Sequence, residues 1–201
     1  MQFSRVLIGF VLLSCLACNT NKSTKPLNNT ALTNLTIVNK MALKPMPNSG
    51  QIYYDNQPFS GVSERYFSNA QLAEQIIYVN GVKHGTYKKW FQTGVLSFES
   101  NYKNGVRDGV TKTWWSNGEI RSKAQYKNGI AHGNQEQWYQ SGAKFKEINL
   151  VYGKESGLQR AWRENGKIYN NYEAKNGRIF GLKRANLCYE LDEEVIQYQE
   201  I

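Results

Sequence analysis

The sequence predicts an all-β protein whose body is a single-layer antiparallel β-meander of tandem 24-residue, two-strand repeats. Three observations support this prediction. Glycines recur every 24 residues, Asn-Gly dipeptides recur with the same period, and the runs between them are too short for stable helices. The chain of 201 residues is also rich in aromatic residues, at 13%, and poor in proline. We expect the repeat array to span residues 51–181, with a half unit at about 52–60.

Three glycine series share the 24-residue period. The first series begins each unit and consists of Gly61, Gly85, Gly109, Gly133, Gly157 and Gly181. The second series completes Asn-Gly dipeptides, which favour type I′ hairpin turns because both central residues need positive φ; these are at 80–81, 104–105, 128–129 and 176–177. The third series has Ala70 in its first position, followed by Gly94, Gly118, Gly142 and Gly166. We interpret all three series as turn positions between strands whose side chains alternate between two faces.

An aromatic column accompanies these glycines. After Tyr66, its members are Trp90, Trp114, Trp138 and Trp162. One interpretation is a structural ladder along the sheet, in which rings pack on rings or on aliphatic side chains. The other is an exposed aromatic platform that binds a ligand. The candidate residues for such a binding face, including neighbouring lysines, are Trp115, Phe91, Tyr139, Lys88 and Lys112.

Two stretches carry a resemblance to a known family. Residues 85–105 (GTYKKWFQTGVLSFESNYKNG) and 109–129 (GVTKTWWSNGEIRSKAQYKNG) resemble the MORN repeat variant, and the likeness extends over 54–181. The resemblance implies an antiparallel β-sheet array that binds another molecule and has no catalytic module. Proteins of this kind are often classed as YwqK-type antitoxins, and others are exported repeat proteins of unknown role. The fourth unit departs from the pattern at 144–145 and 150–152, which predicts a bulge or register change there.

Residues 1–18 predict a secretory signal peptide with a lipobox. Arg5 precedes an apolar run at 6–13 that is too short to span a bilayer. Because 12–15 (LLSC) resembles a bacterial lipobox, Cys15 is the candidate lipidation site and Cys18 the alternative. An ordinary cleaved signal peptide and an uncleaved anchor remain open. Residues 19–50 are rich in Asn and Thr and lack Asp and Glu, so we expect a flexible polar tether.

The sequence contains no constellation that predicts catalysis, a metal site or a cofactor. His84 and His132 occupy the same column of the repeat, with Asp108 between them. Two units separate the histidines, which places them roughly 19 Å apart in a regular sheet. They therefore cannot share one ion at ligand distances of about 2 Å, and we expect them to belong to surface turns.

The net charge of +9 admits anionic partners. Basic residues occur along the tether and the array, so we expect the charge to be spread rather than gathered into one patch. Residues 182–201 are acidic and break the repeat, which predicts a C-terminal cap over the last strand. Cys188 lies in this segment, where it either packs as a small apolar residue or pairs with Cys18.

Together these features predict a non-enzymatic, membrane-anchored lipoprotein of the bacterial cell envelope, in the inner or the outer membrane. We expect its repeat sheet to bind a protein partner. The alternatives are binding of anionic lipid or an envelope polymer through a basic aromatic face, and antitoxin-like neutralisation of a partner protein. Nucleic acid is not an expected partner, because the chain is predicted to be exported.

Overall fold

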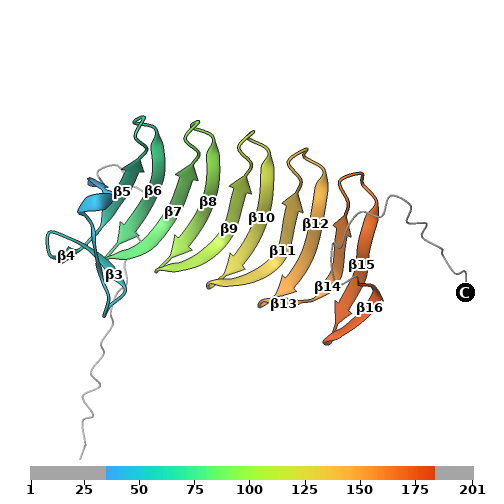
Figure 1. Ribbon diagram of the computed structural model, residues 1–201. Coiled ribbons are helices and arrows are strands. Elements are labelled where there is room, and N and C mark those ends of the chain that lie inside the picture. Colours follow the sequence, from blue (N-terminus) through green and yellow to red (C-terminus); the bar gives the residue numbers. More distant parts are fainter. Residues whose placement is uncertain (1–34, 184–201) are drawn as a thin grey trace, which may run out of the picture. The chain divides into compact units, whose positions relative to one another are not determined.

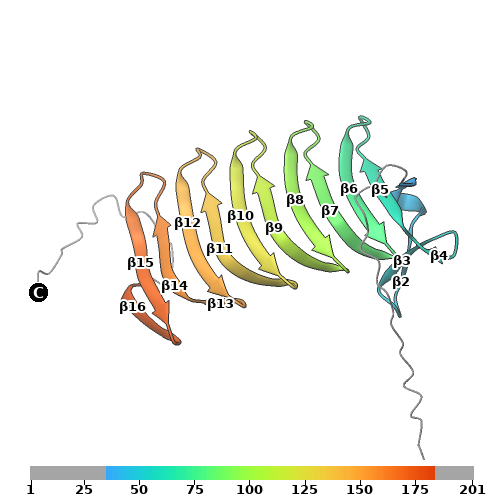
Figure 2. The ribbon, with the colours of Figure 1, turned by 180° about the vertical axis from the view of Figure 1, so that it is seen from behind.

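The computed structural model describes residues 35–183, and these residues form an almost entirely β structure. One sheet of 13 strands follows the order of the chain from β5 to β12, continues with β14, β15 and β16, and has β1 at its first edge. Figures 1 and 2 show these strands side by side in one layer. The predicted all-β antiparallel meander is confirmed. The predicted signal segment with Cys15 and Cys18, residues 19–34 of the tether, and most of the cap with Cys188 lie outside the described residues.

The elements have the following bounds: β1 (Ile37–Asn39), η2 (Lys40–Ala42, a 3₁₀ turn), β2 (Lys44–Met46), β3 (Gln51–Tyr54), β4 (Gln57–Pro58), β5 (Gly61–Tyr66), β6 (Leu72–Val79), β7 (Val82–Trp90), β8 (Leu96–Lys103), β9 (Val106–Trp114), β10 (Ile120–Lys127), β11 (Ile130–Trp138), β12 (Lys144–Val151), β13 (Lys154–Glu155), β14 (Gly157–Trp162), β15 (Ile168–Lys175) and β16 (Arg178–Leu182). Strands β2, β3 and β4 form a separate small sheet.

Two kinds of hairpin turn join the strands, and both use the predicted glycines. Asn80 and Gly81 have φ of 49° and 77°, so the Asn-Gly dipeptides adopt the paired positive φ of a type I′ turn. At the other strand ends, the Phe91 amide donates to the Val95 carbonyl at 2.8 Å. The same loop recurs at Phe67, Trp115, Tyr139 and Arg163, and its fourth residue has positive φ each time. The prediction of turns at these two glycine series is correct.

The glycines that begin each unit are not turn residues. Gly85, with φ of 77°, lies inside β7, where the pairing with β6 shifts between Ile76 and Tyr78. Gly109 and Gly133 occupy the same place in β9 and β11. The interpretation of this series as turns is therefore wrong: its interior members form β-bulges in the middle of long strands. A bulge of this kind needs a positive-φ residue just as a turn does, so glycine alone could not distinguish the two.

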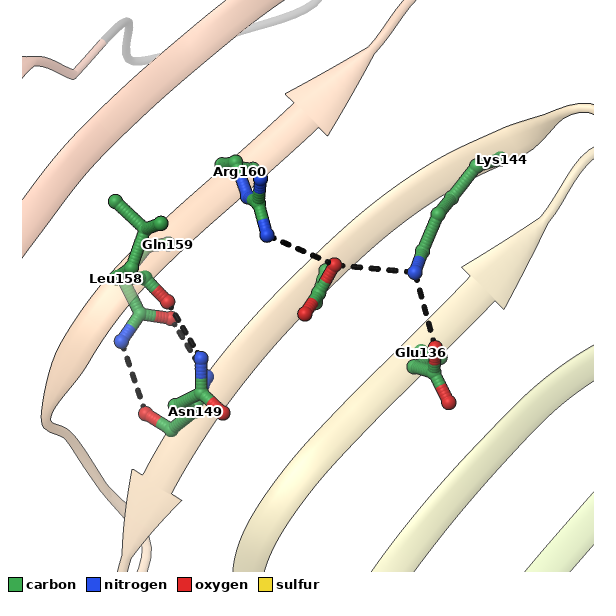
Figure 3. Close-up of polar contacts among 7 residues, drawn as sticks. Glu136, Lys144, Asn149, Leu158, Gln159 and Arg160 are labelled. Atoms are coloured by element: carbon green, nitrogen blue, oxygen red, sulfur yellow. Dashed lines mark hydrogen bonds and ion pairs between the residues drawn. The ribbon is translucent and has the colours of Figure 1, made fainter.

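Glutamine side chains complete the hydrogen bonding at two of these bulges. The Gln135 amide donates to the Gln125 carbonyl at 3.0 Å and to the Gly133 carbonyl at 3.3 Å. Gln159, which is fully buried, both donates to the carbonyl of Asn149 and accepts from its amide, at 2.9 Å each (Figure 3). These side chains replace backbone bonds that the bulges remove.

The fourth unit departs from the pattern at a different place from the one predicted. Lys144 pairs with Trp138 in the register that Ile120 and Trp114 adopt one unit earlier, and a shift beside the aromatic residue recurs in every unit. The shift expected at 144–145 is therefore no peculiarity of this unit. The true irregularity follows the turn, where β13 and β14 are separated at Ser156.

The first edge of the array is covered by residues that the sequence analysis assigned to the tether. Strand β1 pairs in parallel with β5, and the Val38 side chain is 7% exposed in a core cluster with Phe59, Ile76, Tyr78 and Tyr87. For residues 37–46 the prediction of a flexible tether is therefore wrong. A few apolar side chains in this polar segment suffice, because the first unit leaves aromatic surface for them to bury.

Ala70 provides a test of the turn geometry, because its φ is 62° where the other four loops have glycine. We expect Ala70→Gly to raise the free energy of unfolding by about 0.5 kcal/mol, since the left-handed backbone costs an L-residue about 1 kcal/mol and glycine's freedom in the unfolded chain offsets part of that gain. Gly118→Ala is the matched control: a Cβ there meets nothing within 4 Å, so the same two effects act in reverse and should lower the free energy of unfolding by about 0.5 kcal/mol. Urea denaturation measures both variants, and a loss of stability in Ala70→Gly would contradict this account.

Candidate binding surfaces

The large sheet presents two faces of different chemistry. On one, Tyr87 packs against Phe98 and Tyr102 at ring distances of 5.1 and 6.1 Å, and Arg107 lies over Tyr102 and Tyr126. We call this the tyrosine face. The intervening residues point to the opposite side because side chains alternate along a strand.

The opposite side is a charge-ladder face, named for one row of cross-strand neighbours. In strand order from β5 to β15, that row is Glu64, Gln75, Lys88, Glu99, Lys112, Lys123, Glu136, Glu147, Arg160 and Asn171. Lys144 bridges Glu136 and Glu147 at 3.0 Å each, and Arg160 reaches Glu147 at 3.5 Å (Figure 3). Adjacent carboxylates are thus compensated by the lysine that begins β12, at a position where neighbouring units carry Leu or Ile.

The structure divides the predicted binding face between these two sides. Lys88 pairs with Glu99 at 3.4 Å on the charge-ladder face, and Lys112 lies in the same row. The rings of Trp115 and Tyr139 border a hollow on the tyrosine face. Their polar atoms are already engaged: the Trp115 indole donates to the Trp138 carbonyl at 3.2 Å, and the Tyr139 hydroxyl to the Trp162 carbonyl at 2.9 Å.

Phe91 begins the same type of loop as Trp115, one unit earlier along the chain, and is half-buried. The five predicted residues therefore do not form one surface.

The tryptophan column alternates with aliphatic residues. Trp90 and Trp114 pair in register with Leu96 and Ile120, and no two tryptophans are in ring contact within residues 35–183. Trp162 instead lies beneath two cations, Lys144 and Arg160, at 5.8 and 5.5 Å.

The histidine column caps the turns of the following unit. Nδ1 of His84 accepts from the Asn104 amide at 3.5 Å, and Nδ1 of His132 accepts from the Tyr152 amide at 3.3 Å. Asp108 accepts in the same way from the Asn128 amide. Within the described part of the chain, no cluster of three or more His, Cys, Asp or Glu side chains could hold a metal ion.

A buried carboxylate ties the N-terminal segment to the array. Glu74 is 3% exposed and accepts from the Tyr87 hydroxyl and from Lys40, while Arg65 lies 3.5 Å away. Burial raises the pKa of Glu74, but the hydrogen bonds from Lys40 and Tyr87 and the charges of Lys40 and Lys89 outweigh it and hold that pKa below its ordinary value of 4.5. Burial and the bond to Glu74 raise the pKa of the Tyr87 hydroxyl.

The tyrosine face contains a hollow of about 490 Å³. Its lining combines rings, hydroxyls, an amide and a guanidinium, from Thr113, Trp115, Arg121, Ser122, Gln137, Trp138, Tyr139 and Phe145. The guanidinium of Arg121 lies 4.6 Å from the Trp115 ring, and the rings of Tyr139 and Phe145 are 5.0 Å apart. The sequence analysis named Trp115 and Tyr139 as candidates for a binding face. It missed Arg121, Gln137 and Phe145, because the type of residue at these repeat positions differs from unit to unit.

The edge formed by the Asn-Gly turns is cationic, and its exposed cations flank the turns: Lys103, Lys127, Lys154, Lys175 and Arg178. Within the described residues, none of these five forms an ion pair. Exposed aliphatic side chains alternate with them, including Val106, Ile130 and Val151 at 45–48% exposure. The 24-residue period thus groups these five cations along one edge, while the other basic residues of the array are distributed over the sheet.

These features define the class of protein, a single-layer β-repeat array with a cationic edge. The family model of the MORN repeat variant matches two of its units, at residues 83–104 and 107–128. The same columns of glycine and aromatic residues continue outside these two units. No curated protein matches the chain. Among the described residues there is no helix with the length and apolar character needed to cross a membrane.

The Glu74 network predicts a pH dependence of stability. The pKa of Glu74 is lower in the folded than in the unfolded chain, where it is about 4.5. The ionised carboxylate therefore stabilises the fold at pH values above 4.5, and this contribution is lost as the pH falls through the folded-state pKa. We expect Glu74→Gln to lower the free energy of unfolding by about 2 kcal/mol at pH 7, and by progressively less below about pH 4.5. Denaturant titrations across pH measure this difference. Glu99→Gln, in a more exposed pair with Lys88, should cost under about 1 kcal/mol, and a Glu74→Gln effect that is unchanged at pH 3 would contradict the mechanism.

Proposed function

We propose that this protein is a non-enzymatic repeat scaffold that is tethered in the bacterial cell envelope by a lipid on Cys15, or on Cys18, and binds an acidic protein partner. The observation that carries the proposal is the cationic edge defined above. Four of its five turns contribute the five exposed cations, and the turn at 79–82 contributes none. No Asp or Glu occurs within 79–82, 103–106, 127–130, 151–154 or 175–178, but the Asp108 carboxylate accepts from the Asn128 amide and Glu155 directly follows Lys154.

The geometry of this edge suits an extended acidic surface. Successive units lie two strand spacings apart, about 10 Å, so the four turns that carry cations present charge over about 30 Å. Such an arrangement favours association with a partner of opposite potential and fixes its register. The exposed aliphatic side chains between the cations supply apolar surface that an interface can bury.

A scaffold role also agrees with the structural roles of Glu74, Tyr87 and the two histidines. Glu74 and Tyr87 have shifted pKa values, but both belong to the buried network that joins the first unit to η2. The two histidines accept hydrogen bonds from backbone turns. Each of these groups has a structural partner that accounts for its environment.

A second candidate function is binding to an anionic lipid surface through the same edge. Its support is the alternation of exposed aliphatic residues such as Val106 and Ile130 with lysines, a combination that suits the membrane interface. The antitoxin-like role rests only on the resemblance to the repeat family.

Charge reversal along the edge tests the proposed function. The triple variant Lys103→Glu, Lys127→Glu, Lys175→Glu should abolish partner capture, whereas Lys88→Glu with Lys112→Glu on the charge-ladder face should retain it. In cells, a photo-reactive residue at position 127 should give one discrete adduct that the triple variant loses, while one at position 112 should give none.

Vesicle flotation of residues 19–201 separates the protein partner from the anionic lipid surface as the ligand of this edge. The lipid alternative is favoured if the wild-type chain binds phosphatidylglycerol vesicles, the triple variant does not, and no protein adduct forms in cells. That combination of results would contradict the protein partner.

The anchor has its own test. Labelled palmitate should be incorporated into the wild-type chain and the Cys18→Ala variant, and be lost in Cys15→Ala. Loss only in Cys18→Ala would move the anchor to the alternative site. Label that persists in the double variant would refute a lipid anchor on either cysteine.

A further inference from the structure

The hollow on the tyrosine face exists because one row of the sheet changes side-chain size. Along this row, which crosses strands β7 to β12, the residues are Lys89, Phe98, Thr113, Ser122, Gln137 and Lys146. Thr113 and Ser122 occupy the positions of Lys89 and Phe98 one unit later, and their hydroxyls bond to one another at 2.6 Å. Two short side chains thus replace two long ones and leave space beside them.

The groups around this space offer several kinds of contact. Trp115, Tyr139 and Phe145 contribute rings, and the hydroxyls of Thr113 and Ser122 lie between them. The exposed Gln137 side chain makes no hydrogen bond within residues 35–183. Arg121 is likewise without an ion pair in this part of the chain, although its guanidinium is held against the Trp115 ring at 4.6 Å.

We propose that this hollow binds an acidic saccharide. Its volume of about 490 Å³ is in the range of small-molecule sites. A purely aliphatic ligand would leave the Gln137 amide and the Arg121 guanidinium without hydrogen-bond partners, at a cost in binding free energy. A sugar ring offers a C–H face for the aromatic walls and hydroxyls for Thr113, Ser122 and Gln137. A sugar carboxylate matches the planar donor pair of Arg121, which the Trp115 ring holds in place.

The site is distinct from the cationic edge. Trp115 and Tyr139 begin the loops at the opposite ends of the strands from the Asn-Gly turns. Saccharide binding therefore does not depend on the proposed partner, and each can fail without the other.

Calorimetric titration of residues 19–201, which retain every described element, tests the proposal with two saccharides of equal length. Hyaluronan tetrasaccharide carries carboxylates and N-acetyl groups, whereas tetra-N-acetylchitotetraose carries N-acetyl groups and no carboxylate. We expect hyaluronan tetrasaccharide to bind at least about tenfold more tightly, because its carboxylate forms a charge-assisted bond with Arg121. Arg121→Ser should remove this preference. Serine is the residue at the equivalent position of the preceding unit, Ser97.

A second variant fills the hollow. Ser122→Phe copies Phe98 of the preceding unit and should abolish binding of both saccharides, with cooperative thermal unfolding as the check on folding. Where Ser122→Phe does not fold, Thr113→Lys, which copies Lys89, serves the same purpose. Arg178→Ser is the matched control, because it removes an equal charge from the cationic edge and should leave binding within about twofold.

Four results would overturn the proposal. The first is wild-type binding in the filled-hollow variant, and the second is an unchanged preference in Arg121→Ser. The third is the absence of any binding of either saccharide to the wild-type chain. A loss in Arg178→Ser equal to that in Arg121→Ser would also overturn it, since the saccharide would then belong to the cationic edge.

Discussion

A sheet of one layer has no second layer against which to bury its side chains, and the rest of this structure depends on that constraint. Each side chain must be covered by its neighbours on the same face. On the tyrosine face, Ser100 and Thr111 are almost fully buried and hydrogen-bond to one another at 2.7 Å. On the charge-ladder face, oppositely charged side chains cover one another. Stability is therefore assembled from contacts between adjacent strands, as nearest-neighbour terms in a linear array.

The same constraint makes the two described edges of the array different. At the first edge, Val38 and Phe59 add apolar cover and join Ile76, Tyr78 and Tyr87 in a buried hydrophobic cluster. At the other, β16 leaves Ile179 and Phe180 about half exposed. A repeat unit in the interior receives cover from both sides, whereas a terminal unit depends on non-repeated sequence to supply one of them.

Periodicity predicted the features that every unit shares. The order of the strands from β5 onward and both hairpin turns followed from the spacing of glycine and Asn-Gly, whereas the half unit expected at 52–60 lies instead in the small sheet with β3 and β4. The bulge at Gly85 could not be distinguished from a turn, because both require positive φ. The order of residues 37–46 was missed because their composition is polar, and only the aromatic surface of the first unit gives Val38 a place to pack. The alternation of side chains along a strand predicts that Lys88 and Trp115 lie on different faces of the sheet. The register shift beside each tryptophan interrupts that alternation, so the sequence pattern did not reveal the difference.

The surfaces that distinguish this protein arise from positions that its units do not share. A column with the same residue in every unit gives a uniform stripe, which suits structure more than selectivity. Where a column changes, as from Phe98 to Ser122, neighbouring rings no longer have a side chain to cover and a local recess opens. The cationic edge adds the converse case, since one kind of charge repeated at about 10 Å intervals forms an extended surface. The uniform columns therefore build the sheet, and variation within that fixed frame determines where a particular ligand fits.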